Sequence, residues 1–173
     1  MKKIIFLISL LFTRLFLIAQ APIEPASSRP LNSIYINLLG DASLLSMNYE
    51  RNFLISNSFL ISGKLGLGYN EEFQLCIFGP CSPPDNYITI PHHITGNLGK
   101  GRHFFEFGLG GTVINGNSSQ PYLFYPIIGY KMLPLKPNNL NFRIFGQIPF
   151  SGLVTEDILF IPVGISIGIS FRN

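Results

Sequence analysis

The last strand-like segment of the chain places the tightest limit on its fold. From Val163 to Phe171 every second residue is apolar, and Gly or Ser occupies each position between. Because successive side chains of a β-strand point to opposite faces of a sheet, this segment predicts a strand with one apolar face and one small, polar face. The same alternation recurs in earlier segments and predicts eight strands. They are expected at residues 33–40, 43–53, 58–69, 87–98, 102–113, 121–133, 139–149 and 158–171.

The N-terminus has the features of an export signal. Lys2 and Lys3 precede an apolar run at residues 4–12, which Thr13 and Arg14 interrupt before it resumes, and Ala19-Gln20-Ala21 is a small-x-small cleavage site. We expect a signal peptide at residues 1–21, with cleavage after Ala21 or Ala19. A Pro/Ser-rich lead-in follows at residues 22–32, and the strands occupy residues 33–173.

Composition separates a membrane barrel from other all-β folds. Charged residues make up only 12% of the chain and the mean hydropathy is +0.34, whereas soluble domains carry roughly 25% charged residues. After the signal, no apolar run is long enough for a spanning helix. We therefore predict an eight-stranded antiparallel up-and-down transmembrane β-barrel of the bacterial outer membrane, because only every second strand residue must then face lipid.

The connections and faces of the expected strands give the barrel an orientation. The second, fourth and sixth connections are short and the third, fifth and seventh are longer, which predicts short periplasmic turns, outer loops and both chain ends on the periplasmic side. A soluble ligand-binding barrel would turn its apolar face inward. That arrangement would leave an outer surface of Gly, Ser and Thr, so we expect the apolar face to contact lipid and small or polar side chains to fill the interior.

Two groups of residues follow from the strand parity. Aromatic residues collect at the expected periplasmic strand ends and predict a lower aromatic girdle, with Tyr69 and Phe124 in an upper one. The lower girdle comprises Tyr49, Phe53, Phe59, Phe105, Tyr130, Phe142 and Phe171. On the polar face, two acids and two bases predict a neutral charge network that closes the interior. Its members are Glu50, Lys64, Glu106 and Arg143.

Several segments resemble small barrel proteins of Bacteroidota, a largely uncharacterised family. The similarity lies in the opening hairpin around Ile34–Asn37 and Ser46–Arg51, in Leu98–Glu106 and Pro126–Lys131, and at the C-terminus. Gly164–Phe171 resembles the signal that the barrel-assembly machinery reads on the last strand, although Arg172 and Asn173 follow the aromatic residue here. The resemblance implies an eight-stranded barrel in the outer membrane and no catalytic residue.

Few residues suggest further chemistry. Cys76 and Cys81 lie in the longest outer loop of an exported chain and predict a disulfide. His92 and His93 are adjacent in a strand, so they face opposite sides and do not chelate one metal ion. We expect no cofactor, no metal site and no nucleic-acid partner. The expected role is structural or surface contact through the outer loops; a lipid-modifying enzyme and a soluble periplasmic ligand-binding barrel are the alternatives.

Overall fold

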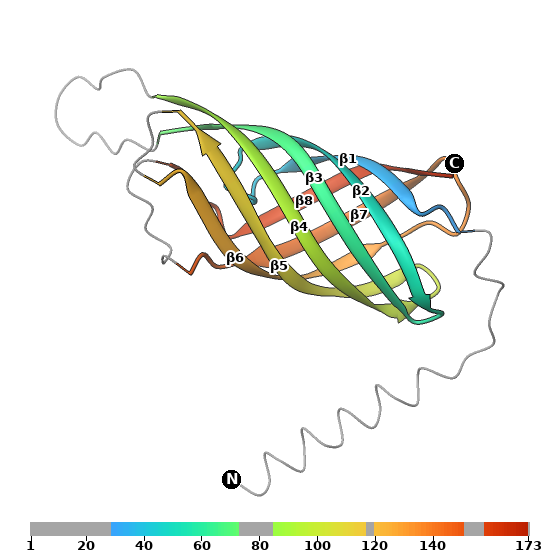
Figure 1. The fold of residues 1–173 in the computed structure, drawn as a ribbon. Helices are drawn as coiled ribbons and strands as arrows, with labels where there is room; N and C mark the ends of the chain where they lie inside the picture. The colour runs from blue at the N-terminus through green and yellow to red at the C-terminus, as the bar shows by residue number, and fades with distance from the viewer. Residues whose placement is uncertain (1–28, 73–84, 117–119, 151–157, 173) are drawn as a thin grey trace, which may run out of the picture.

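The computed structural model describes residues 29–72, 85–116, 120–150 and 158–172. Eight antiparallel strands pair in sequence order, and β1 pairs with β8 to close a barrel (Figure 1). The predicted all-β, up-and-down barrel is therefore confirmed. Its strands are β1 (Asn32–Leu38), β2 (Leu45–Ser56), β3 (Phe59–Glu71), β4 (Asn86–Lys100), β5 (His103–Asn115), β6 (Tyr122–Met132), β7 (Asn139–Gln147) and β8 (Val163–Phe171).

The alternation seen in the sequence becomes the two faces of the wall. In β8, Ile165 and Ile167 are exposed on the outside, while Ser166 and Ser170 are buried in the interior. The other strands follow the same parity, so the apolar face points outward, as the composition indicates. Within the residues that the structure describes, no helix is long and apolar enough to cross a membrane.

The two ends of the barrel differ in what they carry. At one end β1 begins and β8 ends, and the turns after β2, β4 and β6 lie there as well (Figure 1). We call it the terminal end. At the opposite end, the loop end, β1, β3, β5 and β7 finish.

Most predicted strand boundaries lie within three residues of the observed ones, and two of the differences have a clear local cause. β1 stops at Leu38 rather than at residue 40, because Leu39, Gly40, Asp41 and Ala42 all have positive φ values, between 50° and 72°, which a β-strand does not accommodate. β8 begins at Val163 rather than at residue 158. β7 ends at Gln147 and β1 at Leu38, so residues 158–162 lie beyond both ladders, and Ile158 and Phe160 are buried in an apolar cluster inside the barrel.

Strand β6, ambiguous in sequence because of its prolines, is regular. Tyr122, Phe124 and Pro126 face outward, and Leu123 and Tyr125 face inward. The ladder between β6 and β7 starts at residue 127. Pro126, which lacks a backbone N–H, therefore lies just beyond that ladder and costs it no hydrogen bond.

Candidate functional site: the closed interior

Side chains fill the interior in three layers. Leu60, Phe104 and Leu133 form a buried apolar cluster at the terminal end. A larger apolar cluster lies toward the loop end, and charged and polar side chains occupy the middle. The cavity beside Tyr35, Glu50 and Lys131 has a volume of only about 10 Å³, about the space that one water needs.

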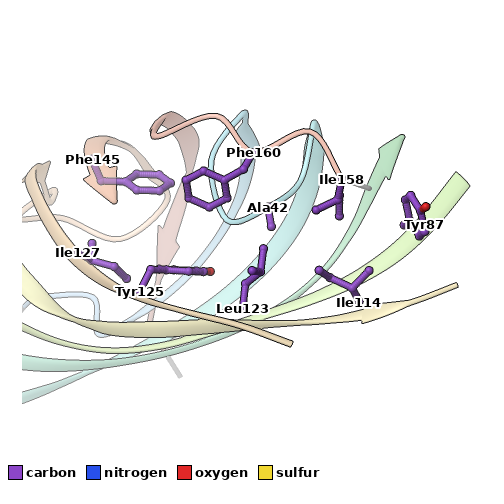
Figure 2. Close-up of a cluster of buried hydrophobic side chains, with 9 residues drawn as sticks. All are labelled: Ala42, Tyr87, Ile114, Leu123, Tyr125, Ile127, Phe145, Ile158 and Phe160. Atoms are coloured by element: carbon purple, nitrogen blue, oxygen red, sulfur yellow. The ribbon is translucent and has the colours of Figure 1, made fainter. Parts of the chain in front are cut away.

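The apolar cluster at the loop end departs from the expectation of a small and polar interior. Figure 2 shows its side chains turned toward one another from several strands, from the β1–β2 connection and from the segment before β8. Its members are Ala42, Tyr87, Ile114, Leu123, Tyr125, Ile127, Phe145, Ile158 and Phe160. Several of these residues come from β6. Because β6 has apolar residues on both faces, the alternation of its sequence does not show which face is inside.

The β1–β2 connection folds into the barrel. Asp41 and Ala42 are completely buried. Gly40, with φ +72°, makes the entry possible, since a Cβ there would lie 3.0 Å from Gly164 Cα and from the Phe145 ring. The β1–β2 connection lies at the loop end, where the other connections are longer, and it is short because it packs inside the barrel.

Asp41 is the centre of the part of the polar layer that lies toward the loop end. Its carboxylate accepts hydrogen bonds from Lys64 on β3 and, at 2.5 Å, from Asn37 on β1. Its Oδ1 also lies 2.9 Å from His93 Nε2 on β4. With its amide oriented to accept from the Asp41 N–H, Gln147 on β7 donates to Oδ1 at 3.3 Å.

These contacts attach the inserted β1–β2 connection to several strands of the barrel wall. The Asp41 carbonyl accepts a further hydrogen bond from Thr112 Oγ1 on β5 at 2.8 Å. Residues of β1, β3, β4, β5 and β7 therefore hold one carboxylate-bearing residue in place.

A second group of ion pairs forms the part of the polar layer that lies toward the terminal end. Lys131 Nζ lies 2.9 Å from Glu50 Oε2 and 3.2 Å from Glu106 Oε1. Arg143 Nε donates to Glu106 Oε2 at 2.5 Å. Tyr35 donates to Glu50, so both carboxylates of this group have several donors.

His93 joins the two groups. Its Nε2 faces Asp41, and its Nδ1 lies 3.4 Å from an Arg143 amino nitrogen. A neutral ring with its proton on Nε2 satisfies both contacts, donating to the carboxylate and accepting from the guanidinium. The Tyr125 hydroxyl also lies 3.3 Å from His93 Nε2, and Arg143 contacts the other ring nitrogen, so the ring is held in place on both sides.

All four residues predicted for the charge network lie in the interior, but they are not paired only with one another. Glu106 and Arg143 are in direct contact, whereas Glu50 pairs with Lys131 and Lys64 pairs with Asp41. Sequence reasoning missed Asp41 because it lies in a connection, and Lys131 because of the ambiguity of β6. With them the network has three carboxylates and three cations, so it stays balanced.

The residues predicted for the girdles lie on the outer face. Tyr49, Phe53, Phe105 and Tyr130 are exposed there in the terminal half, and Phe59, Phe142 and Phe171 are half-buried on the same face. Tyr69 and Phe124 are exposed toward the loop end.

The other two histidines also lie outside and pair with tyrosines. His92 Nε2 lies 2.9 Å from the Tyr122 hydroxyl, and His103 stacks on Tyr130. His92 and His93 thus face opposite sides, as their adjacency predicts. Among the described residues, no group of three or more His, Cys, Asp or Glu could hold a metal ion.

Cys76 and Cys81 lie outside the described residues, and their pairing stays a prediction. We expect mass spectrometry of the exported protein, alkylated without reduction, to find both thiols blocked as one disulfide. The bond would enclose about six residues and stabilise the folded state by about 2 kcal/mol. Alkylation of both cysteines in freshly purified membranes would contradict it, and prior reduction supplies the positive control.

Comparison with models of protein families, with curated proteins and with solved structures finds no match for this chain.

Proposed function

We propose that this protein is a small barrel of a bacterial outer membrane, with a closed interior and a structural or surface-contact role through its loop end. The observation that carries the proposal is the inverted distribution of polarity along the strands: the ion-pair network is inside, and an apolar surface surrounds the wall on the outside. Water-soluble barrels have the opposite arrangement.

The outer face is apolar on every strand. Typical exposed fractions are 53% for Ile36, 63% for Leu67, 71% for Ile94 and 54% for Ile167. An exposed apolar surface that surrounds a soluble protein would cause aggregation, whereas in lipid it costs nothing. Among the strand residues that the structure describes, the charged residues with outward parity are Arg51, Glu71 and Lys100. Glu71 and Lys100 are the last residues of their strands, and the Lys100 ammonium is buried. Arg51 lies in the terminal half of the barrel, opposite the first residue of β1.

The backbone supports the same conclusion. Closure of β1 on β8 leaves no unpaired sheet edge, and a closed barrel is the β-structure that satisfies its backbone hydrogen bonds inside lipid. Aromatic residues lie on the outer face near both ends, where membrane proteins place tyrosines at the interface with water. We propose that the terminal end of the barrel, with both chain termini, lies on the periplasmic side and that β8 is the segment read by the assembly machinery.

The filled interior favours a structural role over transport. Eight strands leave room only for side chains, and here two apolar clusters and one ionic layer occupy that room. A lipid-modifying enzyme is the weaker alternative, since the outer-face histidines contact tyrosine hydroxyls rather than a serine backed by an acid.

The proposal is tested by insertion and conductance. We expect the mature protein to enter neutral phosphatidylcholine vesicles, to require detergent for extraction, and to migrate as a compact form on gels until heated. In planar bilayers the inserted protein should show no large, stable conductance. Extraction with salt or carbonate alone would contradict the membrane location, and a steady open channel would contradict the closed interior.

A further inference from the structure

The charged residues outside the interior network are sorted by the two ends of the barrel. In the described part of the chain, every such acid lies at the loop end: Glu71, Glu72 and Asp85. Every such base lies at or toward the terminal end. The bases are Arg29, Arg51, Lys100, Arg102, Lys136 and Arg172.

No run of the sequence shows this cluster, because each base comes from a different strand or turn. Arg51 lies in β2 opposite the first residue of β1, Arg102 is in the β4–β5 turn, Lys136 is in the β6–β7 turn, and Arg172 follows β8. All four are exposed. Since the strand order is also the spatial order, the bases are spread around the barrel. We call these four residues the basic rim.

The basic rim adjoins the apolar outer face. The Arg51 guanidinium lies 5.7 Å from the centre of the Phe53 ring. The Arg102 carbonyl accepts from Leu133 N at 2.8 Å, which fixes that turn against the end of β6. His103, the next residue, stacks on Tyr130 of the girdle. Cations beside interfacial aromatics lie where lipid headgroups begin.

Above this part of the rim, the outer face has a shallow, open hollow. The hollow has a volume of about 380 Å³ and an apolar lining. Gly146 creates it, because a Cβ at that position would find no atom closer than 3.8 Å. Its outer-face lining includes Phe105, Ile128, Tyr130, Ile144, Gly146 and Val163.

We propose that the basic rim and this hollow together bind an anionic phospholipid of the periplasmic leaflet. The phosphate and acidic headgroup lie among Arg102, His103 and Lys136, and one acyl chain lies in the hollow at Gly146. Charge complementarity selects the headgroup, and the apolar lining selects a chain rather than a free phosphate. The inference rests on the proposed membrane location.

The test uses the full mature protein inserted into vesicles of equal parts phosphatidylethanolamine and phosphatidylglycerol. After mild detergent extraction, native mass spectrometry measures which lipid stays bound. We expect the unchanged protein to retain phosphatidylglycerol preferentially. The double variant Arg102→Gln, Lys136→Gln, called the rim variant, should lose that preference, since each cation near an anionic surface contributes about five-fold in binding. High salt should weaken the preference in the same direction.

Two further variants separate the parts of the site. Gly146→Leu fills the hollow without changing charge, and it should lower retention of both lipids while leaving the preference intact. The control Glu71→Gln, Glu72→Gln, Asp85→Asn neutralises the loop end and should keep both retention and preference. All variants are first checked for the compact, heat-sensitive gel form.

Each outcome decides the proposal. Equal retention of the two lipids by the unchanged protein, or a preference that survives in the rim variant, overturns it. Retention of soluble glycerol phosphate by the extracted protein to the same extent would assign the site to free phosphate instead. If the rim variant loses binding to purified peptidoglycan while its lipid preference is unchanged, the rim serves the cell wall. Failure of the unchanged protein to insert overturns the proposed function as well, which distinguishes the two.

Discussion

Replacing Ile167 with arginine should block most of the protein from assembling into membranes. Ile167 is 54% exposed on the outer face of β8, where Ile36 of β1 and Phe142 of β7 are its pairing partners. On the proposed lipid-facing surface, an arginine at mid-depth costs about 2–4 kcal/mol. That is a large share of the stability of a domain of this size. The measurement is the fraction of protein that reaches the compact, heat-sensitive gel form in vesicles.

Two matched variants make this result specific. Ile167→Leu keeps an apolar side chain on the outer face, and Ser166→Thr changes the neighbouring residue on the inner face. Both should assemble far better than Ile167→Arg. If the arginine variant assembled as well as the leucine variant, the outer face would be in water, and a soluble barrel would have to replace the membrane proposal.

The strands that form the barrel wall can be predicted from the sequence, because apolar and polar residues alternate along most of them with a two-residue period. All eight strands occur where the alternation places them, and most boundaries agree within a few residues. Glu50, Lys64, Glu106 and Arg143 fall inside by the same parity. The two-residue period does not assign faces in β6, because apolar residues occupy both faces of that strand. Lys131 could therefore not be assigned to the interior from its neighbours.

The filling at the loop end is harder to predict than the wall. Asp41 lies in a connection, where strand parity does not apply, and only Gly40 hints at an unusual backbone. The six-residue β1–β2 connection turns into the barrel because residues of five strands, such as His93 and Thr112, contact it there. Such long-range contacts are invisible in a local pattern. The basic rim is missed for the same reason, since topology alone gathers its members.

Replacing Arg143 with alanine should destabilise the barrel by about 3–5 kcal/mol, because the change leaves a buried network with one negative charge too many. Arg143 is 3% exposed; it pairs with Glu106, contacts His93, and lies 4.1 Å from the centre of the Phe145 ring. Lys131 and Thr95 still contact Glu106 in the variant. They keep the carboxylate partly compensated, and the three interior acids then face two cations.

A cycle of variants distinguishes a stranded charge from lost packing. Arg143→Lys keeps the cation and should recover part of the loss, while Arg143→Met with Glu106→Gln removes both charges of the pair. Because a buried ion pair is replaceable by neutral groups at little cost, the double variant should be more stable than Arg143→Met alone. Unfolding in urea is followed by gel mobility, since the chain has no tryptophan to report by fluorescence. A double variant no more stable than Arg143→Met would mean that the arginine acts through its packing on Phe145, and that charge balance is not what holds the interior closed.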